Sequence, residues 1–261
     1  MPGARRWLLS CAKVSAKSRL VLSVDRLDCS KGIPERIKAF ERFLEMYPDW
    51  HGKATLLQLT PKSWSDIKHY AEIESEVAAL IGKVNGRFGD AAWTPIRYVN
   101  RSYSRTVLAG IYRAADVAMT TPLRDGMNLA AKEFLAAQDP DDPGVLMLSQ
   151  FAGAAMELGE ALIVNPHETD AVAAGLKRGL EMRLDERRER HAPMLAHLLK
   201  NDIKRWSKSY TSTLVNGGTR RGVLGVIRAL LKSSTAQMPR AASEASRHGR
   251  RSGAATPPHL C

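Results

Sequence analysis

The sequence predicts an α/β fold with a doubly wound, parallel sheet, and three observations support this prediction. Six short apolar runs, each bounded by turn residues, are typical of buried parallel strands: 20–24, 55–59, 96–99, 117–121, 145–148 and 161–164. Stretches with helical periodicity separate them, as in successive strand–helix–strand units. The length of 261 residues is enough for one substantial core and a small additional element.

The helical stretches follow the strands in regular alternation. Between 34 and 47, apolar residues recur every three or four positions, and Pro48 follows the stretch where a helix is expected to end. The other predicted helices span 63–84, 104–114, 127–137, 169–182 and a long segment at 185–210. Right-handed crossovers would place every strand parallel, with ligands outside the carboxyl ends of the strands.

The charge distribution divides the chain into a body and two ends. Of the formal net charge of +12, residues 1–19 contribute +5 and residues 217–261 contribute +7, which leaves the body, 20–216, with no net charge. We therefore expect a basic N-terminal extension at 1–19 and a basic, poorly ordered tail at 217–261. Because the excess lies only in the ends, we expect no nucleic-acid partner.

The cysteines and the hydropathy exclude several further classes of protein. Cys11, Cys29 and Cys261 are widely spaced, so neither a disulfide framework nor a zinc site is expected, and a reducing, cytoplasmic location fits. No stretch approaches the ~20 apolar residues that a transmembrane helix needs, so no membrane partner is expected. The glycine fingerprints of dinucleotide sites and P-loops are missing from the sequence.

The most informative motif is TPLRDGMNLAAKE at 121–133, which joins a predicted strand to an alanine-rich helix. The first turn of such a helix offers unpaired N–H groups and a partial positive charge, which suit the phosphates of a nucleotide. Glu133 follows one turn later and could reach a ribose hydroxyl. The alternative for each residue is structural: Asp125 could cap the helix, and Glu133 could pair with Lys132 or Arg124.

A second motif, VLSVDRLDCSKG at 21–32, also runs from a predicted strand into a polar turn. Arg26 and Lys31 flank this strand end, and a guanidinium with an ammonium makes a suitable clamp for a diphosphate. Pro34 follows at a position that the first turn of a helix tolerates. Either cation alone could be a solvated charge, but two strand-end motifs in one α/β pattern favour a shared site.

The two motifs resemble those of the trehalose-6-phosphate synthase family, retaining glycosyltransferases of the two-domain GT-B type. The resemblance extends from residue 21 to about 214 and includes further motifs: WTP at 93–95, AAQDP at 136–140, LSQFAGAA at 148–155, LIVNP at 162–166 and KNDI at 200–203. It covers only the second half of such an enzyme. It therefore implies that 20–216 is a single Rossmann-like, nucleotide-sugar-binding C-terminal domain.

The resemblance also implies a role for each residue of the two motifs. Arg26 and Lys31 would act in catalysis by holding the diphosphate of UDP-glucose and neutralising the leaving group. Donor-binding residues would provide contacts to glucose, ribose and uracil: Asp125, Gly126, Met127, Asn128, Leu129, Glu133 and Tyr103. Tyr103 could instead be a core residue. No metal or other cofactor is expected, because two cations and a helix end can supply the electrostatic stabilisation.

By resemblance, the reaction transfers glucose from UDP-glucose to glucose 6-phosphate with retention of configuration. The acceptor pocket and the catalytic histidine of the family belong to an N-terminal half, so glucose 6-phosphate is expected to bind only when that half is supplied. Trp64 stands where the family has an arginine for the acceptor phosphate, and an indole carries no charge. Three interpretations remain: a donor half inactive alone, a non-catalytic UDP-sugar-binding or regulatory module, and a decayed fragment. A homo-oligomer is possible in each.

Overall fold

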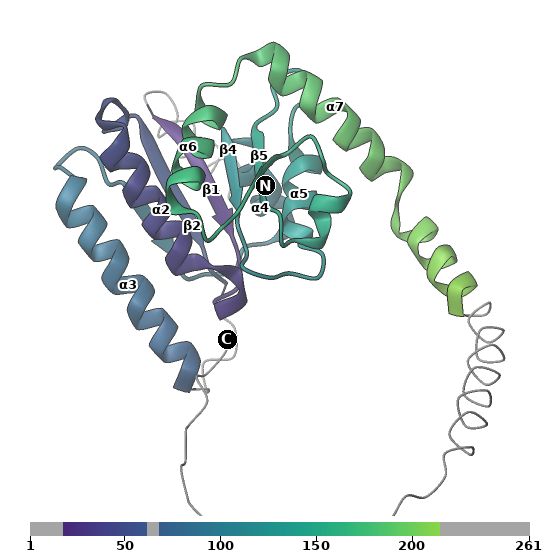
Figure 1. Ribbon diagram of the computed structural model, residues 1–261, viewed down its shortest axis with the longest axis horizontal. Coiled ribbons are helices and arrows are strands. Elements are labelled where there is room, and N and C mark those ends of the chain that lie inside the picture. Colours follow the sequence, from purple (N-terminus) through teal and green to yellow (C-terminus); the bar gives the residue numbers. More distant parts are fainter. Residues whose placement is uncertain (1–17, 62–67, 215–261) are drawn as a thin grey trace, which may run out of the picture. The chain divides into compact units, whose positions relative to one another are not determined.

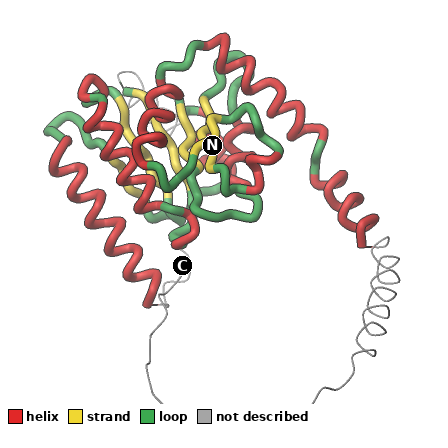
Figure 2. The backbone as a smooth tube through the Cα atoms, in the orientation of Figure 1, coloured by secondary structure: helices red, strands yellow, loops and turns green. Residues whose placement is uncertain are grey.

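The computed structural model describes residues 18–61 and 68–214. Their strands form one six-stranded parallel sheet in the order β3-β2-β1-β4-β5-β6. The strands are β1 (Arg19–Val24), β2 (Ala54–Leu59), β3 (Ile96–Val99), β4 (Val117–Thr120), β5 (Val145–Ser149) and β6 (Leu162–Val164). Figure 2 shows them as a single central layer among the helices. The predicted fold class and all six predicted strands are confirmed, with bounds that differ by one residue or less.

Helices cover both faces of this sheet, as a doubly wound fold requires. One face packs against α2 (Ile33–Met46), α3 (Lys68–Phe88) and α6 (Thr169–Leu180), and α2 and α6 lie in front of the sheet in Figure 1. The other face packs against α4 (Arg105–Arg113), α5 (Leu129–Ala137) and α7 (Leu184–Lys200). Strand β1 shows the alternation directly, because Val21 belongs to the first apolar cluster and its neighbours Leu20 and Leu22 belong to the second.

Two predicted helices differ from the observed ones in ways that have local causes. The helix predicted from 127 begins at Leu129, because Asn128 adopts a left-handed conformation with φ of 71°. The helix predicted to end at 84 continues to Phe88. In this last part, Asn85 donates from Nδ2 to the carbonyl oxygen of Ile96 and accepts on Oδ1 from the N–H of Ile96. Residues 62–67, which include Trp64, lie outside the described residues.

The C-terminal part of the body also differs from the prediction. The long helix expected at 185–210 ends as α7 at Lys200, and a separate helical stretch covers 203–214. The compact unit that holds the sheet ends at Leu199, and the described residues 200–214 belong to a second unit.

The sheet order places a topological switch point between β1 and β4. These two strands are neighbours, with Val21 opposite Val117 and Leu22 opposite Ala118, yet the chain leaves them toward opposite edges of the sheet. Loops that follow such a pair diverge and open a crevice at the carboxyl ends of the strands, where α/β proteins bind their ligands. Both sequence motifs follow these two strands.

Candidate functional site

The loops after β1 and β4 are tied directly to each other. The carbonyl oxygen of Ser30 accepts hydrogen bonds from the backbone N–H groups of Leu123, at 2.8 Å, and Arg124, at 3.2 Å. Gly32 has a φ of 62°, and a Cβ atom there would lie 2.9 Å from the carbonyl oxygen of Thr121. A glycine is therefore required where the first loop enters α2 beside the second.

This arrangement brings Lys31 and Asp125 together. Nζ of Lys31 lies 2.5 Å from Oδ2 of Asp125, and each side chain is 15% exposed. Asn128 also donates from Nδ2 to the same carboxylate oxygen, at 3.0 Å. A cation expected to hold phosphate and a carboxylate expected to hold sugar hydroxyls thus lie side by side at the switch point.

The cap of α5 is Asn128 and not Asp125. Oδ1 of Asn128 accepts a hydrogen bond from the backbone N–H of Ala131 at 3.0 Å, which satisfies one of the unpaired donors at this helix start. The capping alternative considered for Asp125 is therefore wrong. The carboxylate of Asp125 points instead toward Lys31 and Asn128.

A third loop holds the residues around Gly126 in place. Asp125 donates its N–H to the carbonyl oxygen of Phe151 and accepts from the N–H of Gly153 at 3.0 Å, and the carbonyl of Met127 accepts from Ala154 at 2.8 Å. A Cβ atom on Gly153 would lie only 2.1 Å from the carbonyl oxygen of Gly126. The backbone at 125–127 is thus fixed by η3 (Gly153–Met156) and the preceding turn.

The start of α5 is open on its outer side. Leu129 is exposed, and a Cβ atom on Gly126 would meet no other atom within 4 Å. A ligand could therefore approach the backbone of Gly126 closely, next to the positive end of the helix. Met127 is half-buried, and Asn128 is buried in its capping position.

Beneath the two loops lies a fully buried arginine, Arg36 of α2. Its guanidinium donates to Oγ of Ser23 on β1, Oε1 of Gln58 on β2 and Oγ1 of Thr121 after β4. It also donates to the carbonyl oxygen of Lys31, at 3.1 Å. One side chain therefore connects β1, β2 and the residue that follows β4 with the loop that carries Lys31.

Arg36 forms an ion pair with Asp25, whose Oδ2 lies 2.9 Å from Nη1. Burial raises the pKa of Asp25, and the positive charges of Arg36 and Lys31 offset part of that increase. Burial likewise lowers the pKa of Arg36, and Asp25 offsets part of that decrease. The charges of Lys31 and Asp125 also affect the pKa of Asp25. One electrostatic cluster at the ends of β1 and β4 therefore contains four charged residues: Asp25, Lys31, Arg36 and Asp125.

Arg26, the second expected phosphate ligand, lies on the surface after β1. Nearby Asp28 caps η1 (Cys29–Lys31) by accepting from the N–H and hydroxyl of Ser30, both at 2.9 Å. Burial raises the pKa of Asp28, but these bonds and the charges of Lys31 and Arg26 outweigh it, so the pKa lies below its usual value. Asp28 is thus an anion between the two cations.

Glu133 and Tyr103 lie on the face of the sheet that α4 and α5 cover. Glu133 is exposed, and its Oε2 accepts a hydrogen bond from the hydroxyl of Tyr112 at 3.2 Å. Its neighbour Lys132 pairs with Glu157 at 2.7 Å, so the Lys132 alternative for Glu133 is wrong. Tyr103 is half-buried and packs against the apolar cluster of this face, so the core alternative for Tyr103 is supported.

Two residues that matter at this site were missed by the sequence analysis. Arg36 adjoins the apolar stripe of its helix, and nothing in the local spacing shows that it is buried. Tyr112 resembles an ordinary core residue of the helix before β4. Arg36 is 85 residues from its partner Thr121 in the sequence, and Tyr112 is 21 residues from its partner Glu133. The one signal for Arg36 in the sequence was its position: a cation in the first turn of a helix that follows directly after a strand end.

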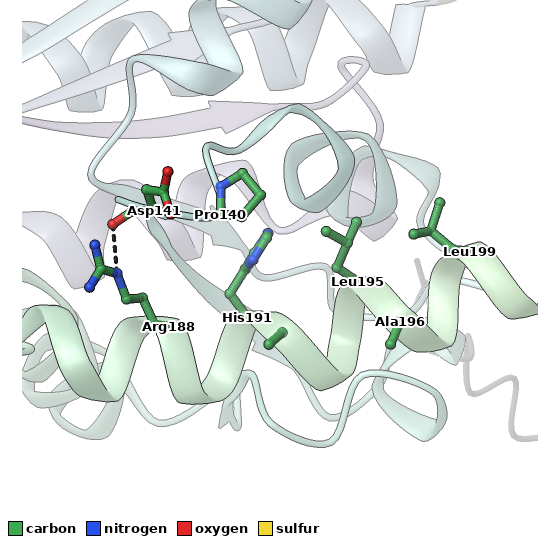
Figure 3. Close-up of a pocket in the computed structure, with 8 residues that line it drawn as sticks. Pro140, Asp141, Arg188, His191, Leu195, Ala196 and Leu199 are labelled. Carbon is green, nitrogen blue, oxygen red and sulfur yellow. Dashed lines mark hydrogen bonds between the residues drawn. The ribbon is translucent and has the colours of Figure 1, made fainter.

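A separate pocket of about 440 Å³ lies along α7, away from these residues. Arg188, His191, Leu195 and Leu199 of α7 line one side, and Pro140 and Asp141 line the other (Figure 3). The walls are mainly apolar, Nε of Arg188 donates to the carbonyl oxygen of Asp141 at 2.7 Å, and His191 bonds the carbonyl of Leu135. None of the expected site residues lines this pocket.

The described residues offer neither a metal-binding cluster nor a membrane-crossing helix. Across 18–61 and 68–214, the structure contains no group of three or more His, Cys, Asp or Glu side chains that could hold a metal ion. Within the same ranges, no helix is both long enough and apolar enough to span a bilayer.

Comparisons with known proteins identify clear relatives. The profile of glycosyltransferase family 20 matches residues 5–216. A trehalose-6-phosphate synthase from Sinorhizobium fredii is 51% identical over 203 residues, which cover 78% of this chain and 44% of the relative. A trehalose-6-phosphate synthase from Escherichia coli K12 is 52% identical over 194 residues, or 74% of this chain and 41% of the relative.

Solved structures agree with these sequence matches. An Escherichia coli structure described as bound with UDP-2-fluoro glucose superposes with a TM-score of 0.78 at 48% identity, covering 80% of this chain and 46% of that one. A Burkholderia xenovorans trehalose-phosphate synthase in complex with glucose-6-phosphate superposes with a TM-score of 0.79 at 45% identity, covering 81% and 47%. The chain therefore spans less than half the length of these relatives.

Proposed function

Because the chain belongs to glycosyltransferase family 20, we propose that its sheet domain binds UDP-glucose and supplies the donor half of a trehalose-6-phosphate synthase. The observation that carries this proposal is the pairing of the loops after β1 and β4 at the switch point, with Lys31 and Asp125 in contact. The relative solved with UDP-2-fluoro glucose superposes on this domain, which supports a nucleotide-sugar ligand.

The proposed roles follow the chemistry of each group. Arg26 and Lys31 bind the diphosphate and neutralise the charge that develops on it as the glycosidic bond breaks. Asp125 accepts hydrogen bonds from hydroxyls of the donor glucose. The backbone at Gly126, Met127, Asn128 and Leu129 contacts the sugar and phosphates, Glu133 binds the ribose, and the backbone near Tyr103 meets the uracil.

In the proposed reaction, the acceptor hydroxyl of glucose 6-phosphate attacks from the face that the UDP leaves. The departing phosphate assists removal of the acceptor proton, so the configuration at the sugar is retained without a carboxylate pair such as hydrolases use. The role of this domain is to hold the leaving group and to stabilise its charge. A preorganised site achieves this without reorganisation during the reaction.

The acceptor side of the reaction requires a second domain. The matched relatives are more than twice as long as the region they share with this chain. We therefore propose that 20–216 is the donor domain between the basic segments 1–19 and 217–261, and that glucose 6-phosphate binds only where a complementary domain is present. The same observation favours a second candidate, a UDP-sugar-binding module without transferase activity.

Calorimetry on the full chain with UDP and with UDP-glucose tests the proposed ligand. We expect Lys31→Ala to weaken UDP binding about 10- to 100-fold, since bonds to charged groups are the stronger kind. Lys38→Ala is the matched control, because Lys38 is an exposed lysine of α2 that forms a 3.7 Å surface pair with Glu76. Equal binding by wild type and Lys31→Ala would show that the phosphate clamp is wrongly assigned.

A further inference from the structure

A buried tyrosine reaches the exposed carboxylate of Glu133. The hydroxyl of Tyr112, near the end of α4, donates to Oε2 of Glu133, one turn into α5, at 3.2 Å. Tyr112 is only 4% exposed, whereas Glu133 belongs to the exposed residues. The contact thus joins a fixed residue to one that would otherwise move freely in solvent.

Two contacts immobilise Tyr112, and a further hydrogen bond fixes one of its partners. Its ring lies edge-on to Phe134, with a centroid distance of 6.3 Å. Its carbonyl oxygen accepts a hydrogen bond from Nε2 of Gln138 at 2.6 Å, and Oε1 of Gln138 in turn accepts from the N–H of Gly144 at 2.7 Å. The hydroxyl is therefore held at one position relative to α5.

The electrostatics keep this hydroxyl a donor. Burial raises the pKa of Tyr112 far above its usual value, and the charge of Glu133 and its hydrogen bond raise it further. The phenol is consequently protonated at every physiological pH, so it can donate a hydrogen bond to the carboxylate of Glu133. The charge of Asp25 at the end of β1 adds a smaller increase to the pKa of Tyr112.

From these contacts we propose that Tyr112 is a positioning residue that fixes the carboxylate of Glu133 for the ribose hydroxyls of a nucleotide. This inference rests on the proposed function, in which Glu133 binds the ribose. A carboxylate has two oxygens and about four acceptor positions, so one bond from Tyr112 leaves capacity for a ribose diol. Fixing a flexible glutamate before binding removes an entropic cost that the ligand would otherwise have to offset.

The test measures discrimination among UDP, 2′-deoxy-UDP and 3′-deoxy-UDP by calorimetry on the full chain. Tyr112→Phe retains the ring and deletes only the hydroxyl. We expect it to weaken UDP binding about 3- to 10-fold, the range for loss of one hydrogen bond, and to weaken at least one deoxy analogue less. Tyr47→Phe is the matched control, since Tyr47 packs on Phe43 beyond the end of α2, and it should leave all three affinities unchanged.

A second pair of variants separates positioning from packing. In a Glu133→Ala background, Tyr112→Phe should cause no further loss of UDP affinity, because its effect passes through the carboxylate. An equal loss for all three nucleotides, or the same loss with and without Glu133, would overturn the inference and leave the proposed function standing. Failure of the folded wild type to bind UDP at all would overturn both.

Discussion

Nζ of Lys31 lies 2.5 Å from Oδ2 of Asp125, so the proposed phosphate ligand and the proposed sugar ligand neutralise each other. Both side chains are largely shielded from water, where such a pair is stronger than on an open surface. A diphosphate that binds Lys31 must compete with the carboxylate of Asp125. When a donor sugar binds, its hydroxyls can replace Lys31 as hydrogen-bond donors to that carboxylate. The ion pair therefore couples the two parts of the donor site.

The coupling makes Asp125→Asn an informative substitution. Removing the carboxylate frees Lys31 and removes a negative charge beside the phosphates, so UDP should bind about 3- to 10-fold more tightly. UDP-glucose should lose any advantage over UDP, because its sugar contact is weakened. Calorimetry with both ligands provides the comparison. Weaker binding of UDP by Asp125→Asn would contradict the proposed competition.

The chain by itself is expected to form no trehalose 6-phosphate from UDP-glucose and glucose 6-phosphate. Much of the rate of such a transfer comes from holding donor and acceptor in one geometry, and this chain matches only 41% of the Escherichia coli relative. The measurement is product formation by the purified full chain, with a no-protein reaction as control. Product above that control would show that the chain binds the acceptor unaided.

Arg36→Met is expected to destabilise the fold by about 3–5 kcal/mol, because it leaves Asp25 as a buried, uncompensated charge. Adding Asp25→Asn should recover part of this loss. Urea unfolding measures both. Arg42→Met is the matched control: Arg42 pairs with Asp170 at 2.7 Å but is 41% exposed, so its removal should destabilise the fold far less than the loss of Arg36.

The cost of Arg36→Met should depend on pH. Without the guanidinium, burial raises the pKa of Asp25 in the folded state further above its unfolded value of 3.8. The folded variant then binds a proton more readily than the unfolded chain, so its stability rises as the pH falls toward 4. Unfolding at pH 7 and at about pH 4.5, each relative to wild type, should show a smaller deficit at the lower pH. An equal loss of stability at the two pH values would mean that the buried charge of Asp25 is not the cause of the destabilisation.

Gly153→Ala is expected to displace the backbone that presents Gly126, since the new Cβ would lie 2.1 Å from a carbonyl oxygen. Overpacking of this kind typically costs about 1–3 kcal/mol, and UDP-glucose affinity should fall with it. Gly82→Ala serves as the control, because Gly82 is in α3 with no atom within 4 Å of the new Cβ. That variant should be stabilised by up to about 1 kcal/mol.

The order of the elements could be predicted from the sequence because buried parallel strands are short apolar runs, a local property. A second rule, that the carboxyl ends of neighbouring parallel strands lie at one edge of the sheet, predicted that the two motifs lie close together. The direct contact of Lys31 with Asp125 was not predicted. The burial of Arg36 could not be predicted, because it depends on Ser23 of β1, Gln58 of β2 and Thr121 just after β4, which only the fold brings together. The contact between Tyr112 and Glu133 likewise depends on how α4 packs against α5.

The start of α5 shows a finer limit. Asp125 and Asn128 are both good capping residues, and the sequence did not distinguish them. The choice depends on Lys31: the carboxylate of Asp125 forms an ion pair with Lys31, and Asn128 caps the helix. A contact between residues 94 apart thus decides a feature that looks local.

The adjacency of β1 and β4 has a consequence for synthesis on the ribosome. The backbone N–H of Leu20 donates to the side chain of Asp116, which lies 96 residues later in the sequence. β1 therefore cannot pair with β4, its second neighbour, until most of the domain has been synthesised. In the meantime β1, β2 and β3 can assemble, with the inner edge of β1 unpaired and open to association with other chains. Closing so long a loop is slow, and we expect β1–β4 pairing to be the late step of folding. The proposed donor site would then form only in that step, so a nucleotide present during synthesis could bind only after the two strands had paired.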